Sequence, residues 1–173
     1  MPKPLWTPTQ EQVAQANMTA FMETVRSQWG FDAESYSYLY DWSIKNPETF
    51  WQAIWDFCGV IGDKGKKAFQ PASEMFKSRF FPEARLNFAE NLLRPRDDET
   101  VIIFRGEDRV KRSMTFKSLF EQVSQCAAAL KELGVQKGDR VAGYLPNMPE
   151  TIVAMLATTS LGAILLRPAN SLH

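Results

Sequence analysis

Few residues of this chain have a type and spacing that could do chemistry. The single histidine is His173, the last residue, so a histidine triad, a histidine general base or a histidine metal cluster inside the folded part is not expected. Paired carboxylates stand at Asp97–Asp98 and at Glu107–Asp108. Such pairs can act as general acid and base, but these two occur in polar turns, where we interpret them as solvated. The sequence therefore predicts no catalytic residue and no metal ligand.

Two cysteines and one glycine-rich loop are the remaining candidates. Cys58 and Cys126 form neither a CxxC pair nor a zinc spacing, so we expect two reduced, largely buried thiols. Residues 62–67 make a short basic loop with two glycines and three lysines. Because the loop does not match GxxxxGK[ST], a solvated turn is favoured over a phosphate-binding site. No cofactor-binding residue is predicted.

Composition narrows the class of protein further. The 173 residues carry 20 basic and 20 acidic side chains, with 45% hydrophobic and 12% aromatic residues. This excludes global disorder and gives no basic face for nucleic acid. The longest apolar stretch, residues 153–166, is shorter than the roughly 20 residues of a membrane span. The N-terminus lacks the apolar run of a signal peptide, so we expect a cytoplasmic protein without a nucleic-acid or membrane partner.

The first half, residues 1–98, is rich in aromatic residues and predicts helices joined by irregular segments. One helix is predicted to begin at Thr7–Pro8 and to end at Gly30. A short helix over 35–44 precedes another that starts at Asn46–Pro47 and is apolar on more than one face, so these two should pack together. Core packing is favoured over a ligand cage for their aromatic side chains. The sequence of residues 80–93 indicates a docking segment, which would attach the N-terminal half to another structure.

From residue 99 onward the pattern alternates between strands and helices. Strands are predicted at 101–104, 110–114, 141–145 and 163–166. Thr115 should cap a long helix with an apolar stripe from Leu119 to Leu133, and Pro149 should open another that runs to about residue 161. Short links between these elements are typical of a right-handed parallel layer. The predicted fold class is α/β: a helical N-terminal region followed by the first strands and helices of a large parallel-sheet domain, left incomplete.

Spaced motifs in both halves resemble the adenylate-forming acyl-CoA synthetases. The second half carries Thr115-Phe116-Lys117-Ser118-Leu119, Leu133-Gly134-Val135, Lys137-Gly138-Asp139-Arg140-Val141, Leu145-Pro146-Asn147 and Pro149-Glu150. The first half carries Tyr40-Asp41-Trp42-Ser43-Ile44, Pro47-Glu48-x-Phe50-Trp51 and Phe81-Pro82-x-Ala84-Arg85-Leu86-Asn87. These first-half motifs resemble the N-terminal region of the acetyl-CoA synthetase type. Within that group, Ala16-Asn17-Met18, Trp55-Asp56-Phe57 and the motif at residues 81–87 look most like the acetoacetyl-CoA synthetases.

The resemblance implies a ligase reaction in two steps. A carboxylate attacks the α-phosphate of ATP, releasing diphosphate, and the CoA thiol then displaces AMP from the acyl-adenylate. Members of the family use ATP, Mg²⁺ and CoA, with a phosphate loop and a catalytic lysine. Neither motif occurs in these residues, so no catalytic, cofactor-binding or metal residue is carried over, and the chain alone is expected to be inactive. A non-catalytic interaction module and an acetyl- or propionyl-CoA synthetase relative stay open as alternatives.

The resemblance also divides the chain. We expect residues 1–98 to form the acetyl-CoA-synthetase-type N-terminal region and residues 99–164 the start of the AMP-binding domain. Residues 165–173 do not match the family and are interpreted as a foreign tail. A truncated or frame-shifted gene, or a fragment, would explain this tail, and the chain would then associate with the missing remainder of the ligase.

Overall fold

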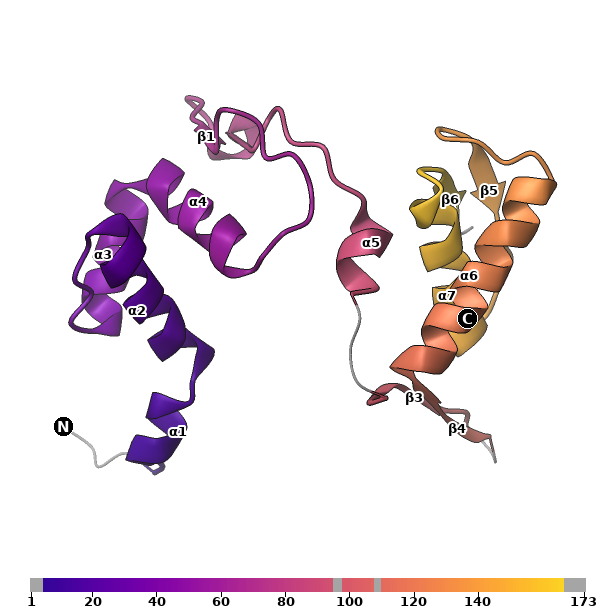
Figure 1. The fold of residues 1–173 in the computed structure, drawn as a ribbon, viewed down its shortest axis with the longest axis horizontal. Helices are drawn as coiled ribbons and strands as arrows, with labels where there is room; N and C mark the ends of the chain where they lie inside the picture. Colours follow the sequence, from indigo (N-terminus) through magenta and orange to yellow (C-terminus); the bar gives the residue numbers. More distant parts are fainter. Residues whose placement is uncertain (1–4, 95–97, 108–109, 167–173) are drawn as a thin grey trace. The chain divides into compact units, whose positions relative to one another are not determined.

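The computed structural model describes residues 5–94, 98–107 and 110–166, and it divides the chain into two compact units, Met1–Arg85 and Leu86–His173. Figure 1 traces helices through most of the first unit and a mixture of strands and helices in the second. Asp97, Asp108 and the end of the predicted tail, with His173, lie outside the described residues.

The first unit begins with two helices where the sequence predicted one. Helix α1 spans Gln10–Ala14 and α2 spans Asn17–Trp29. The cap of α1 is Thr9 rather than Thr7, because Thr9 and Gln12 form a reciprocal capping box in which each side chain accepts the other's backbone N–H. The helix-ending residue was predicted correctly, since Gly30 takes the left-handed conformation with φ of 66°.

Helices α3, Tyr36–Lys45, and α4, Pro47–Phe57, pack together as predicted. The buried core of the unit comprises Phe21, Val25, Ala33, Leu39, Trp42 and Ala53. Aromatic side chains surround it, with Phe31 stacked on Trp42 at 5.1 Å between ring centroids. Trp42, Phe31 and Phe50 are therefore core and core margin, as the sequence favoured, whereas Tyr36, Tyr38 and Tyr40 on α3 are exposed.

A small antiparallel pair completes the first unit. Strand β1, Phe69–Gln70, pairs with β2, Arg79–Phe80, and a 3₁₀ helix, Met75–Lys77, lies in the connection between them. Cys58, which follows α4, is exposed rather than buried, so that part of the cysteine prediction was wrong; neither cysteine forms a disulfide.

The second unit holds a hairpin and a parallel strand pair. After α5, Phe88–Leu92, strands β3, Thr100–Arg105, and β4, Lys111–Thr115, pair antiparallel. Helix α6, Phe116–Glu132, leads to β5, Arg140–Ala142; α7, Pro149–Ser160, then crosses over to β6, Ile164–Leu166, which is parallel to β5. The α/β class and its incomplete sheet are confirmed.

The expectation of one right-handed parallel layer was wrong within the described residues, because only β5 and β6 pair in parallel. Strand β3 pairs with β4 and with no other described strand, while β5 and β6 form a separate pair. The connection from β3 to β4 is short and is closed by a hydrogen bond from Gly106 N to Val110 O. A link of this length joins antiparallel strands, whereas parallel neighbours need a longer crossover.

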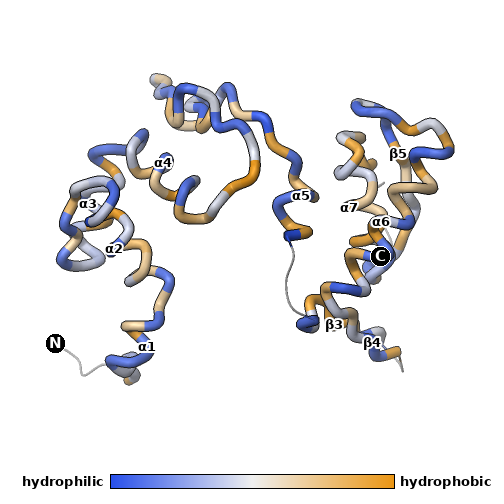
Figure 2. Tube along the Cα trace, in the orientation of Figure 1, coloured by the Kyte–Doolittle hydropathy of each residue, from blue (hydrophilic) through white to orange (hydrophobic). Residues whose placement is uncertain are grey.

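Helices α5, α6 and α7 enclose the core of the second unit. Its buried residues are Ala89, Leu119, Val123, Val153, Leu156 and Ala157. Leu133 was predicted on this stripe but lies beyond the end of α6 and is exposed. In Figure 2 polar and apolar residues alternate along α6. Of the helices that the structure describes, none has both the length and the apolar character needed to cross a bilayer.

Candidate functional site

Ligands of parallel sheets commonly bind beyond the carboxyl ends of the strands. In this chain that edge is the segment between β5 and α7, residues 143–148. The hydroxyl of Thr151 donates to Pro146 O at 2.5 Å and ties the segment to the first turn of α7. Met148 caps the helix without a side-chain hydrogen bond. Gly143 is the one glycine of this segment, so the segment has no glycine-rich cradle for a phosphate.

The first turn of α7 carries its own carboxylate, that of Glu150. Glu150 accepts two hydrogen bonds from the guanidinium of Arg112 on β4, at 2.7 and 2.9 Å. These bonds hold the pKa of the Glu150 carboxyl below its ordinary value and raise the pKa of Arg112. A negative charge in the first turn is favoured by the helix dipole. The pair therefore fastens the hairpin to α7 and places an anion where a phosphate would otherwise be attracted.

The basic glycine loop at residues 62–67 is ordered by carboxylates. Gly65 N donates to the Asp63 side chain at 2.9 Å, and Lys66 N donates to Glu83 at 2.9 Å. The ammonium of Lys64 bonds both carboxylate oxygens of Asp56, at 2.7 and 3.0 Å. A phosphate would need these same N–H groups. The interpretation of the loop as a turn is supported by this geometry.

The residues present do not fit a magnesium site. Mg²⁺ prefers several oxygen ligands, often carboxylates, around one point. Within residues 5–94, 98–107 and 110–166 no three acidic, cysteine or histidine side chains are grouped so as to hold a metal ion. Glu107 is exposed, and its neighbour Asp108 is not described.

Residues of the predicted docking segment, 80–93, make several contacts with parts of the chain distant in sequence. In the first unit Phe81 packs on Trp55 at 4.7 Å between ring centroids, and Arg85 exchanges two backbone hydrogen bonds with Asp63, at 2.8 and 2.9 Å. In the second unit the Asn87 side chain donates to Thr159 O and Ser160 O, at 3.1 and 3.0 Å. The segment thus has anchors in both units.

Sequence reasoning missed the Asn87 and Arg112–Glu150 contacts. Asn87 caps α5 by accepting from Glu90 N at 3.1 Å, and the Asn-x-x-Glu spacing is a signal that could have shown the cap. Its bonds to α7 have no local signal, because the partners are 72 and 73 residues away. The ion pair likewise joins residues 38 apart.

Two family models match adjoining parts of the chain. The model of the acetyl-coenzyme A synthetase N-terminus matches residues 36–92, and the model of AMP-binding enzymes matches residues 88–170. The docking segment lies across the boundary between the two matches. The class defined by these matches is a chain that joins an N-terminal region of the acetyl-coenzyme A synthetase type to a region similar to AMP-binding enzymes.

The relatives give a narrower family. The chain is 46% identical over 162 residues to the acetoacetyl-coenzyme A synthetase of Rhizobium meliloti, covering 94% of this chain and 25% of that one. It is 38% identical over 155 residues to a malonamoyl-CoA synthetase of Penicillium aethiopicum, covering 85% and 21%. The structure of acetoacetyl-CoA synthetase from Streptomyces lividans matches with a TM-score of 0.80 at 35% identity, covering 96% of this chain and 26% of that one.

The chain is thus a homologue of the acetoacetyl-CoA synthetases and matches the N-terminal part of their fold. It spans about a quarter of the length of the curated relatives that it matches.

Proposed function

We propose that this chain forms the N-terminal part of an AMP-forming acyl-CoA ligase that acts on acetoacetate. The observation that supports this most directly is the structural match to an acetoacetyl-CoA synthetase over 96% of the chain. In the proposed reaction the acetoacetate carboxylate attacks the α-phosphate of ATP, diphosphate leaves, and the CoA thiol then replaces AMP. The substrates of the whole ligase would be acetoacetate, ATP and CoA, in the cytoplasm.

The role proposed for this chain is structural within that ligase. Its described residues offer no phosphate cradle and no fit for Mg²⁺, so we derive no chemical step from them. Residues 1–98 would form the N-terminal region, and residues 99–164 would begin the AMP-binding domain. The contacts of Phe81 and Arg85 support a role for residues 80–85 in ordering the first unit, and the contact of Asn87 supports a role for this residue in ordering the second.

The test measures ATP–diphosphate exchange that depends on acetoacetate. The chain alone should give no exchange, because its sequence contains neither the phosphate-loop motif nor the catalytic-lysine motif. A chimera, in which residues 5–166 replace the matching segment of the Rhizobium meliloti enzyme, should retain exchange. An Asn87→Asp chimera should retain less, because it loses the donor that holds α7. A soluble but inactive chimera would contradict the proposal, as would exchange by the chain alone.

Malonamate is a second candidate substrate, since a malonamoyl-CoA synthetase is 38% identical to this chain. Adding to the chain, in trans, the remainder of the Rhizobium meliloti enzyme or the remainder of the malonamoyl-CoA synthetase, with acetoacetate, malonamate or acetate as the acid, compares the two candidates and the acetyl branch. Exchange with acetoacetate above that with the other acids supports the first candidate. A stable chain that binds another partner and never complements would favour the alternative of a non-catalytic module.

A further inference from the structure

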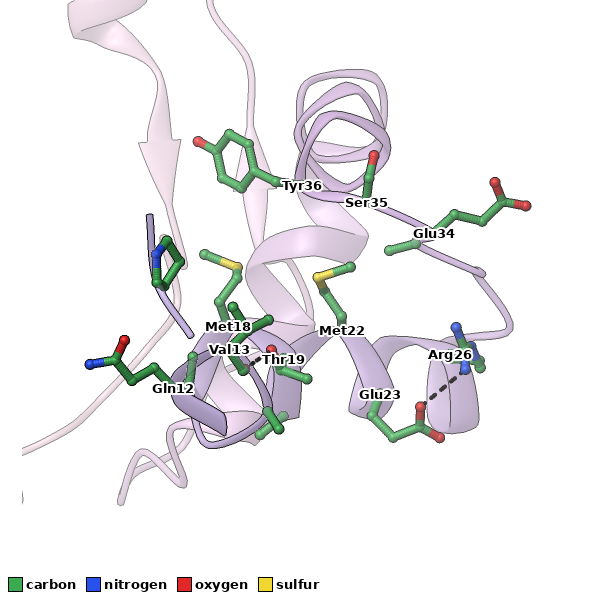
Figure 3. A pocket seen from close by; sticks show the side chains of 15 residues that line it. Gln12, Val13, Met18, Thr19, Met22, Glu23, Arg26, Glu34, Ser35 and Tyr36 are labelled. Atoms are coloured by element: carbon green, nitrogen blue, oxygen red, sulfur yellow. Dashed lines mark hydrogen bonds and ion pairs between the residues drawn. The ribbon is translucent and has the colours of Figure 1, made fainter. Parts of the chain in front are cut away.

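An open groove with a volume of about 840 Å³ lies in the first unit, where α1, α2 and the start of α3 meet. Figure 3 shows Met18 and Met22 in its middle, between Val13 on α1 and Tyr36 at the start of α3. Val13 and Met18 leave almost half of their surface exposed, and Tyr36 leaves more. We call this surface the methionine groove. Methionine side chains adapt to apolar partners of different shapes.

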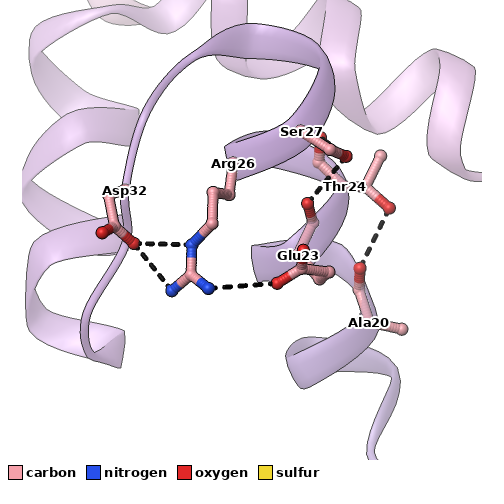
Figure 4. Close-up of polar contacts among 6 residues, drawn as sticks. All are labelled: Ala20, Glu23, Thr24, Arg26, Ser27 and Asp32. Atoms are coloured by element: carbon pink, nitrogen blue, oxygen red, sulfur yellow. Dashed lines mark hydrogen bonds and ion pairs between the residues drawn. The ribbon is translucent and has the colours of Figure 1, made fainter.

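The rim of the methionine groove is acidic. Glu23, Glu34 and Arg26 are the charged side chains among its described lining residues. Figure 4 shows that Arg26 is already engaged, since it donates to Asp32 at 2.7 Å and to Glu23 at 3.3 Å. Since the two lining carboxylates, Glu23 and Glu34, outnumber the one guanidinium, the lining keeps a net negative charge and favours a cationic partner.

The same unit presents an apolar projection with cationic neighbours. Met75 and Phe76 lie in the connection between β1 and β2 and are 94% and 80% exposed. The ammonium of Lys77 lies 5.5 Å from the centre of the Phe76 ring and also contacts Glu74, while Arg79 is exposed on β2. We call Met75 and Phe76 the apolar knob. Two consecutive large apolar side chains that are both exposed to solvent are typical of an interaction surface.

We propose that the apolar knob of one copy of the chain docks in the methionine groove of a second copy. The floor of the groove is apolar, like the knob, and Lys77 and Arg79 would face the acidic rim at Glu34. The knob and the groove are different surfaces, so the contact is heterologous and does not close into a two-copy dimer. One phenylalanine and one methionine bury less area than a standard interface, so the association should be weak and should weaken further with salt.

Sedimentation velocity over a concentration series tests this contact. Phe76→Ser removes the knob and Met18→Glu obstructs the groove; both residues are exposed, so the fold should persist. Each variant should lower the association constant about tenfold or more, as loss of a central anchor does. The matched control is Tyr38→Ser, which removes an exposed aromatic ring outside both surfaces and should leave association unchanged.

Mixing the two variants gives the decisive result. Met18→Glu keeps its knob and Phe76→Ser keeps its groove, so the mixture should form a 1:1 dimer that neither variant forms alone. Lys77→Glu should weaken association, and pairing it with Glu34→Lys in the second copy should restore it. A wild-type chain that stays monomeric throughout, or a mixture that associates no better than its components, would overturn the proposal. With Ile164→Lys and Leu166→Lys in every chain, so that the exposed face of β5–β6 does not contribute, association that survives both single substitutions would overturn it too.

Discussion

The side-chain amide of Asn87 forms hydrogen bonds with the beginning of α5 and with the end of α7. Its side-chain oxygen accepts from Glu90 N and caps α5, and its nitrogen donates to Thr159 O and Ser160 O at the end of α7. The last carbonyls of a helix lack partners within the helix. Because the side chain is half-buried, we expect its loss to cost more than that of a surface cap.

Two substitutions separate these functions. Asn87→Asp keeps the cap but loses both donor bonds and brings a negative charge to the carbonyls of α7, whereas Asn87→Ala loses everything. If the bonds to α7 dominate, both variants should lower the free energy of unfolding by about 1–3 kcal/mol. Urea unfolding measures this, with Asn147→Asp in an exposed loop as control. An Asn87→Asp chain as stable as the wild type would show that capping alone matters.

The Arg112–Glu150 pair predicts a dependence of stability on pH. Because the folded state lowers the pKa of Glu150, the pair stabilises the fold above the unfolded pKa of about 4.3. This stabilisation is lost as the pH falls through the lowered pKa. Glu150→Gln should therefore unfold more easily than the wild type at pH 6, and the difference should vanish near pH 2. Thermal unfolding between pH 2 and 7 measures it, and parallel curves would contradict the prediction.

At the scale of elements, the loop at residues 62–67 depends on one glycine. Gly65 has φ of 68°, and a Cβ built on it would lie 2.5 Å from Glu83 Cβ. That approach is too close for real atoms, and the backbone of Glu83 stands behind it at 3.3 Å. Glu83 also accepts from Lys66 N, so moving it would disturb the loop.

Gly65→Ala should therefore destabilise the first unit by more than the roughly 1 kcal/mol that a left-handed alanine costs. Gly30→Ala is the matched control, because Gly30 has φ of 66° and nothing within 4 Å of a built Cβ. The difference between the two variants measures the clash with Glu83. Tryptophan fluorescence during urea unfolding gives both values, and equal losses would refute the steric explanation.

Local signals explain which elements the sequence could predict. Gly30, Pro47, Thr115 and Pro149 mark helix ends through backbone chemistry within a few residues, and the structure has helix ends at each. The cap of α1 was wrongly predicted at Thr7 because Thr-Pro is typical of a helix start. In the structure the capping box is formed by Thr9 and Gln12. The pairing of β3 with β4 alone was missed because periodicity identifies a strand and not its partner.

The candidate site shows the same difference between local signals, which the sequence reveals, and contacts between distant residues, which it does not. The absence of a phosphate-loop pattern could be read directly from the spacing of glycines and lysines. The carboxylates that order residues 62–67 could not, since Glu83 lies 17 residues beyond the N–H that it accepts.

For the molecule as a whole, the strand pair β5–β6 has an outer face that is not covered by the described residues. Val141 and Leu165 are paired and half-buried, whereas their neighbours Ile164 and Leu166 are 47% and 45% exposed. Alternate residues of a strand point to opposite faces, so these two exposed side chains share one face. Parallel sheets are normally covered on both faces. This chain spans about a quarter of the length of its relatives. In those relatives we expect other segments of the protein to cover the corresponding face.

The chain by itself should therefore tend to aggregate through this face and the open strand edges. Ile164→Lys with Leu166→Lys should raise the concentration at which light scattering begins, with little change in the free energy of unfolding. Leu165→Lys is the matched control: its half-buried side chain points to the other face, so the same charge should destabilise the unit without protecting it. A wild-type chain that melts sharply, and scatters no more light than the double variant, would show that the outer face needs no cover.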